Sequence, residues 1–163
     1  MHRTTVRSSL LSICLVATLT GSAKAEGPTP YGAPINLAQA KKVAAGATAH
    51  ANANNWAVVI AIVDSGGHLV LLERLDNTQI GSIEIAQLKA KTAVNFRRPT
   101  KFWEDRIAKG GRDVKLLKIN GFPMEGGLPI VHEGKVIGAI GVSGVSSTQD
   151  AEIGMAGIAE LTK

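Results

Sequence analysis

The chain has 163 residues, of which 45% are hydrophobic, so it can form one domain with an adequate core and leaves little room for a second. Its formal net charge is +5, and three of its basic residues lie among the first 25. The rest of the chain has 15 basic and 13 acidic side chains. This weak charge and an aromatic content of 4% argue against nucleic acid as a partner, because such binding uses many cations and stacking side chains.

The first 25 residues have the pattern of a cleavable export signal. Arg3 and Arg7 form a basic start, Leu10 to Leu19 an apolar stretch, and Ala23-Lys24-Ala25 a small-residue cleavage site. The apolar stretch is too short to span a bilayer stably. We therefore expect a periplasmic or secreted protein without a stable membrane anchor. Cys14 leaves with the signal, so the mature chain has no thiol for catalysis, metal binding or a disulfide.

The remaining chain predicts a flexible leader and then regular elements. Residues 26–35 are rich in glycine and proline, which is typical of an extended leader. Asn36 is suited to cap the first helix. Hydrophobic periodicity predicts, in chain order, helix 37–54, strands 56–63 and 68–75, helix 82–96, a short helix 99–110, a loop 112–127, strands 128–132 and 136–143, and helix 147–161.

Paired strands without alternating βαβ units predict an antiparallel sheet with helices packed on it, which is an α+β domain over residues 36–163. The turn between the first two strands holds Asp64, Gly66, Gly67 and His68. A carboxylate at this place can accept hydrogen bonds from backbone N–H groups, and glycines allow a tight turn, so the segment is predicted to be mainly a turn. His68 is a ligand, a base or a solvent-facing residue, and it has no second histidine at metal-ligand spacing.

Three further groups of residues have alternative interpretations. His50 lies on the apolar stripe of the first helix, with Val43 and Ala47. It is either an imidazole packed in the core or an interface, or an axial ligand of haem iron. The sequence Glu125-Gly126-Gly127 either turns backbone amides towards an anion or forms a bend. Positive charge around the central helices is either a solvated face or a cradle for ligand carboxylates, and it comes from Lys89, Lys91, Arg97, Arg98, Lys101 and Arg106.

Four ordered motifs carry a family resemblance: "NNWAVVIAIVDSGGHLVLLERLD", "QLKAKTAV", "GGLPIVHEGKVIGAIGVSG" and "QDAEIGMAG". Together they resemble the GlcG/HbpS-like haem-binding family, which includes the C-terminal domain of PduO-type proteins. The match runs from about Leu37 to Leu161. The resemblance implies a profilin-like domain with a five-stranded antiparallel sheet flanked by helices, and assembly into homo-oligomers, often octamers.

The same resemblance implies haem as the ligand, and exported relatives that bind, sense or degrade it. Thr92 in "KAKTA" matches a threonine that resembles an iron-contacting ligand, while the alternative for Thr92 is a hydrogen bond to its own helix. His50 and Thr92 both stand as candidate iron ligands, with Arg97, Arg98 and Lys101 as partners for the haem propionates.

An enzyme acting on a small carboxylate, as in glycolate-locus relatives, is the alternative function. It would use Asp64, His68 or Glu125 as acid–base groups. The sequence contains neither a recognisable Ser/His/Asp triad nor carboxylates paired at helical spacing, so binding of a small molecule is favoured over catalysis.

Overall fold

The computed structural model describes residues 28–161 and residue 163, so the expected export signal lies outside the described residues. The elements in chain order are α1 (Leu37–Ala53), β1 (Val59–Asp64), β2 (Leu69–Arg74), α2 (Ser82–Phe96), α3 (Lys101–Ala108), the 3-10 helix η1 (Gly111–Lys118), β3 (Gly127–His132), β4 (Lys135–Ser143) and α4 (Ser147–Leu161). The α+β class expected from the sequence is confirmed.

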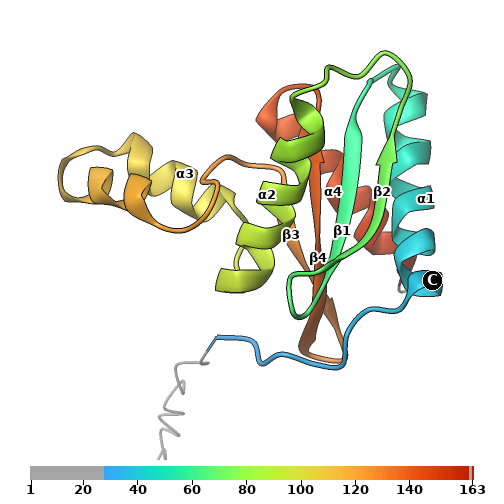
Figure 1. Cartoon of the computed structure of the whole chain (residues 1–163), viewed down its shortest axis with the longest axis horizontal. Helices are drawn as coiled ribbons and strands as arrows, with labels where there is room; N and C mark the ends of the chain where they lie inside the picture. Colours follow the sequence, from blue (N-terminus) through green and yellow to red (C-terminus); the bar gives the residue numbers. More distant parts are fainter. Residues whose placement is uncertain (1–27, 162) are drawn as a thin grey trace, which may run out of the picture.

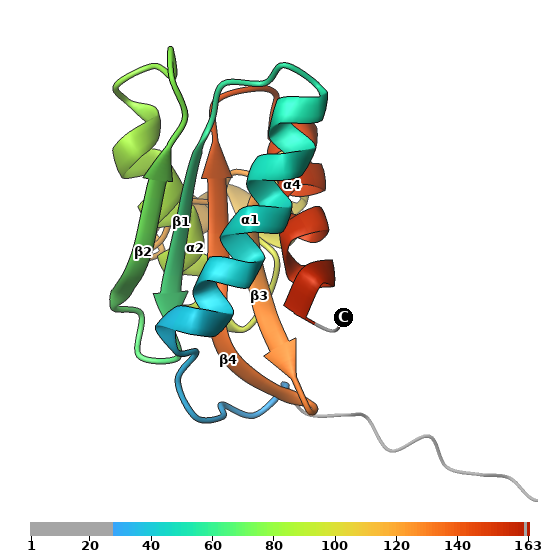
Figure 2. The same ribbon diagram turned by 90° about the vertical axis from the view of Figure 1, so that its right-hand side faces the viewer.

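One antiparallel sheet in the order β2-β1-β4-β3 lies between two helical layers. Helices α1 and α4 pack on each other over one face, and α2 covers the other face (Figures 1 and 2). Side chains on α1 and α2 are therefore separated by the thickness of the sheet, so candidate residues on these two helices cannot share one site within a chain.

The expectation of five strands is wrong, because the described residues form a sheet of four. The segment nearest to a fifth strand is residues 30–35, which run beside the start of β4. This segment makes one isolated parallel bridge, between Tyr31 and Val136, and three backbone hydrogen bonds of 2.8–2.9 Å to β4. Pro30 and Pro34 have no N–H to donate, so a regular ladder cannot extend along it.

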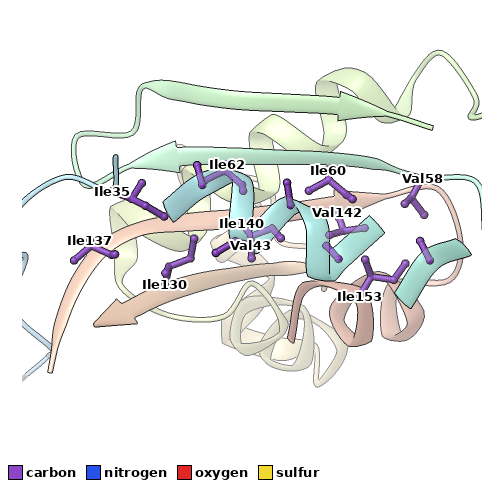
Figure 3. Packing of buried hydrophobic residues seen from close by; sticks show 14 residues of the cluster. Ile35, Val43, Val58, Ile60, Ile62, Ile130, Ile137, Ile140, Val142 and Ile153 are labelled. Atoms are coloured by element: carbon purple, nitrogen blue, oxygen red, sulfur yellow. The ribbon is translucent and has the colours of Figure 1, made fainter. Parts of the chain in front are cut away.

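Strand β1 is buried on both faces, which explains its run of β-branched residues without polar alternation. Val58, Ile60 and Ile62 belong to the core beneath α1 and α4 (Figure 3). Val59, Ala61 and Val63 point to the opposite face, towards α2. The protein is thus a three-layer sandwich with two hydrophobic cores.

The two cores differ in side-chain size. Isoleucine is the main residue of the core under α1 and α4, whereas the buried residues that face α2 are valines and alanines. At Gly141 of β4 a Cβ atom would collide with the carbonyl group of Ala86 in α2. The glycine therefore lets the backbone of α2 lie directly on the sheet.

Most helix boundaries agree with the sequence. The predicted cap of α1 is confirmed as a capping box, in which Asn36 and Gln39 exchange side chain-to-backbone hydrogen bonds of 2.9 and 3.1 Å. The expected loop 112–127 is in part the 3-10 helix η1. Three-residue periodicity over eight residues is difficult to distinguish from a loop in sequence, because such helices are short and irregular.

Residues 100–127, called the arm, leave the end of α2 and return to β3. Figure 1 shows α3 and η1 projecting away from the sheet, and neither helix contains a buried residue. The two ends of the arm meet: the amide of Thr100 donates to the carbonyl oxygen of Gly127 at 2.9 Å, and the amide of Gly127 donates to Thr100 Oγ1 at 2.9 Å. The arm is therefore a long loop whose two ends are joined where it leaves and re-enters the rest of the domain.

Candidate functional site

A buried ion pair lies where α2, β4 and α4 meet. Lys89 of α2 is fully buried, and its Nζ donates to Asp150 Oδ2 at 2.8 Å and to the carbonyl oxygen of Val142 at 3.0 Å. Asp150 Oδ1 accepts the amide of Val145 at 3.2 Å. Burial raises the pKa of the Asp150 carboxyl, while the hydrogen bond and charge of Lys89 act in the opposite direction.

The glycine pair of the arm closes over this ion pair. A Cβ atom at Gly126 would lie 2.8 Å from Lys89 Nζ. The amide of Gly127 already donates to Thr100, and the amide of Glu125 donates to Glu104 Oε2 at 2.6 Å. These two amides have acceptors within the protein, so the segment is a packed bend that encloses Lys89, and its geometry does not make an anion cradle.

Thr92 lies on α2 close to the same bend and is 1% exposed. Its Oγ1 donates to the carbonyl oxygen of Leu88 at 2.7 Å and accepts the amide of Phe122 at 2.7 Å. The first bond is the within-helix bond considered as the alternative to iron binding. Because the segment around Phe122 covers this oxygen, iron could reach it only if that part of the arm moved away.

The basic candidates at the end of α2 already have partners. Arg97 donates to the carbonyl oxygen of Thr29 at 3.2 Å and lies 5.0 Å from the ring of Tyr31. Arg98 lies 4.6 Å from the ring of Phe102, and Lys101 pairs with Asp105 at 2.7 Å. Arg97 therefore fastens the leader, and Arg98 the arm, to the end of α2, whereas the pair of Lys101 lies within α3.

Asp64 holds the turn between β1 and β2. Its Oδ1 accepts the amides of Gly66 at 2.8 Å and His68 at 2.9 Å, and Gly67 has the positive φ of 81° that favours glycine. The side chain of His68 is 84% exposed and its Nδ1 lies 3.4 Å from Asp64. These contacts are those of a turn.

The three acid–base candidates of the alternative enzyme do not form one site. Asp64 pairs with Gly138 of β4, whereas Gly126, the residue after Glu125, accepts a hydrogen bond from the amide of Val142. Four residues of strand separate these positions by roughly 13 Å. In the described part of the chain, no three His, Cys, Asp or Glu side chains gather as metal ligands would.

The other face of the protein carries a groove of about 650 Å³ between α1 and α4. Its lining includes the small residues Ala45, Gly46, Ala49 and Ala156 and the polar residues Lys42, His50 and Glu160. The Nε2 atom of His50 is buried and has no hydrogen-bond partner among the described residues. The ring of Trp56 lies beside this imidazole, with centroids 5.9 Å apart.

The sequence candidates therefore fall into two separate groups. His50 lies on α1, and Thr92, Arg97 and Arg98 lie on or directly after α2, across the sheet. Within one chain, a single haem cannot contact both His50 and Thr92. Of the two side chains, only His50 combines a polar atom without a partner with an adjacent groove.

Comparison with known proteins gives the family. The model of the family described as "Haem degrading protein HbpS-like" matches residues 35–159. The chain belongs to the HbpS-like family. It is 40% identical over 109 residues to protein GlcG of Escherichia coli K12, which covers 67% of this chain and 81% of GlcG.

Two solved structures support this membership of the HbpS-like family. A double mutant of HbpS from Streptomyces reticuli superposes with a TM-score of 0.72 at 29% identity, covering 85% of this chain and 94% of that one. A complex of PduOC with haem gives a TM-score of 0.72 at 28% identity, covering 78% of this chain and 94% of that one. The expected GlcG/HbpS-like family is confirmed.

Sequence reasoning missed the enclosure of Lys89, which it grouped with other cations as either a solvated face or a cradle for ligand carboxylates. A signal was available in the spacing. Ser82, Ala86 and Lys89 follow one another at intervals of four and three residues, which places all three on the buried stripe of α2. Asp150, the partner of Lys89, did not stand out as a candidate in the sequence. The pairing of these residues joins positions 61 apart in the sequence, which periodicity cannot reveal.

Proposed function

We propose that this protein binds haem in the groove between α1 and α4, with His50 as the ligand of the iron. The observation that carries the proposal is the Nε2 of His50, which is covered but has no hydrogen-bond partner among the described residues. Turning this imidazole towards the groove that His50 lines would therefore break no hydrogen bond of Nε2. An unpaired polar atom in a protein interior costs about 1–3 kcal/mol. A neutral imidazole nitrogen is also a common axial ligand of haem.

The groove fits such a ligand in size and lining. Its volume of about 650 Å³ lies within the roughly 300–1,000 Å³ usual for small-molecule sites. Alanine side chains on both helices, with Gly46 on α1, leave an apolar surface for a flat macrocycle. Lys42, two helical turns before His50, supplies a cation for a propionate group. Bound haem would supply a redox-active iron, and the protein would supply one imidazole and an apolar wall.

Export and assembly complete the proposal. The signal-like residues 1–25 support a periplasmic or secreted protein that meets haem outside the cytoplasm. The groove is open on one side, so a second copy of the chain would bury a haem that one copy leaves half in water. Haem sensing and haem degradation are activities that this binding site would serve.

Titration of the protein with haemin tests the site. Saturation at a defined stoichiometry with a shifted Soret band is expected for the native protein. His50→Ala should move the Soret band and change the spin state, and Ala45→Glu should weaken binding by placing a charge in the groove. His68→Ala is the matched control, because its imidazole is solvent-exposed.

The outcomes separate the function from the site. Absorbance that rises without saturation would contradict haem binding. Saturable binding with an unchanged spectrum in His50→Ala would leave the function standing and remove His50 as the ligand. In that case a spectral change in Thr92→Val would indicate that the arm opens to expose the threonine.

A further inference from the structure

The outer surface of η1 is organised in three rows by its three-residue period. Arg112, Lys115 and Lys118 form an exposed basic row. Val114 and Leu117 form the neighbouring row and are 48% and 61% exposed. The third row, Asp113, Leu116 and Ile119, is half-buried. Aliphatic and basic side chains are therefore presented to solvent next to each other along the whole of η1.

A bidentate ion pair fixes this orientation. Arg106 of α3 donates from Nε and from one terminal nitrogen to the two carboxylate oxygens of Asp113, at 2.9 and 2.8 Å. Such paired hydrogen bonds set geometry as well as energy. They hold the third row of η1 against α3, while the basic and aliphatic rows are exposed to solvent. Both helices belong to the part of the chain that projects away from the sheet (Figure 1).

Charge is concentrated in the same place. Residues 106–118 contain five basic side chains and one acidic side chain, a net charge of +4. The other described residues contain ten basic and eleven acidic side chains, a net charge of −1. A segment of this kind attracts a dense negative surface, and the nearly neutral body of another copy does not provide one.

From these observations we infer that η1 docks the protein on a membrane surface rich in anionic phospholipid. Basic side chains neutralise lipid headgroups, and adjacent aliphatic side chains enter the boundary of the acyl chains. Because no helix in the described part of the chain is long and apolar enough to cross a membrane, the association is at the surface. The projection of the arm lets η1 reach a plane without contact by the body.

Other partners fit the surface less well. Two aliphatic side chains are a small apolar area for a stable interface between copies, which buries about 800 Å² per partner. Binding of single-stranded nucleic acid uses exposed aromatic rings. The aromatic residues of this region pack on one another instead, with Trp103 5.0 Å from Phe96 and 4.9 Å from Phe102 between ring centroids.

Vesicle sedimentation tests the inference with residues 26–163, so that the apolar segment Leu10–Leu19 cannot bind lipid itself. We expect binding to an equal mixture of phosphatidylglycerol and phosphatidylcholine, weak binding to pure phosphatidylcholine, and release at high salt. The triple variant Arg112→Gln, Lys115→Gln, Lys118→Gln should bind about 100-fold more weakly, from about fivefold per cation. The control with equal charge is Lys41→Gln, Lys91→Gln, Lys135→Gln on the body.

A second variant, Val114→Ser with Leu117→Ser, should also weaken vesicle binding while leaving the folded state intact by circular dichroism. Equal binding to neutral and anionic vesicles, no binding to either, or an equal loss in the two triple variants would overturn the inference. Binding to duplex DNA as tight as to vesicles would identify a general polyanion site. A lower molar mass of the arm triple variant in light scattering, with vesicle binding unchanged, would identify a contact between copies.

Discussion

Lys89 and Asp150 connect the two helical layers of the protein. Their Nζ and Oδ2 atoms are 2.8 Å apart, and their side chains are 0% and 3% exposed. Lys89 belongs to α2 on one face of the sheet, and Asp150 belongs to the first turn of α4 on the other. The carbonyl group of Val142, in the central strand β4, accepts a second hydrogen bond from the same ammonium group.

Replacement of Lys89 by methionine should strongly destabilise the protein. The substitution leaves the Asp150 carboxylate buried without its cation, and removal of one partner of a buried pair costs about 3–5 kcal/mol. Urea unfolding followed by circular dichroism measures the loss. Lys91→Met on the same helix is the control, because Lys91 is exposed and its replacement should change stability by about 0.5 kcal/mol or less. A loss below about 1 kcal/mol for Lys89→Met would show that the pair is dispensable.

Substitutions of Asp64 should separate its hydrogen bonds from its charge. Asp64→Leu removes the acceptor of two turn amides and should cost about 1–3 kcal/mol of folding free energy. Asp64→Asn keeps an acceptor and should cost clearly less. Haemin binding should be unchanged in both variants, since the turn is not part of the groove. Equal, small stability losses with loss of ligand binding would make Asp64 a site residue.

Acid should remove the contribution of the Asp64 charge. Burial alone would raise the pKa of this carboxyl, but the amides of His68 and Gly66 and the His68 ring lower it below 3.8. A carboxyl with a lower pKa in the folded state gives stability that is complete above the unfolded pKa and lost as pH falls through the folded pKa. The stability difference between native protein and Asp64→Asn should therefore be complete at about pH 5 and shrink as the pH falls below 3.8. A difference that grows in acid would contradict this assignment.

Two glycines of α4 should respond differently to alanine. At Gly157 a Cβ atom would lie 2.6 Å from the carbonyl oxygen of Val43 and 3.0 Å from the Cβ of Ala47, so α1 and α4 would have to separate. We expect a loss of about 1–3 kcal/mol from this overpacking. At Gly154 the first neighbour is the end of the Leu128 side chain at 3.0 Å, which can move. Gly154→Ala should be neutral or stabilising by up to about 1 kcal/mol, because alanine favours the helix. Similar thermal denaturation of the two variants would argue against this tight helix contact.

Thr92 should stabilise the arm through its hydroxyl group. Thr92→Val removes the acceptor of the Phe122 amide and should cost about 1–3 kcal/mol, while Thr92→Ser keeps it and should cost less. Hydrogen exchange of the amides of residues 119–122 measures the effect locally, and it should be faster in the valine variant alone. Equal exchange in native protein and Thr92→Val would mean that the bond does not hold this segment.

Much of the fold could be predicted from sequence because each element has a strong local signal. The β-branched run of β1, the Asn36 cap and the alanine stripes locate strands and helices within a few residues. The strand count of five failed because it came from the family resemblance, whereas the β-type runs of the chain itself number four. Prolines in residues 30–35 explain why that segment does not become another regular strand.

The candidate site was less predictable because it depends on which helix covers which face. His50 and Thr92 each have a reasonable local signal, and no periodicity states that the sheet separates them. Likewise, the spacing of Arg112, Lys115 and Lys118 forms a row only after η1 is known to have a three-residue period. Which residues lie on the same face of the folded protein depends on tertiary packing, and local sequence periodicity does not determine it.

The contact between Thr100 and Gly127 has a consequence for how the fold can change. These residues are hydrogen-bonded to each other although 27 positions separate them in the chain. To the sheet, the arm is therefore equivalent to a tight turn between α2 and β3. We expect insertions, deletions or exchange of its outer part, α3 and η1, to leave strand register unaltered, and the entropic cost of a longer connection is small, about 0.6 kcal/mol per doubling of length. The arm is an interchangeable module, through which the same scaffold can acquire new attachments without being refolded.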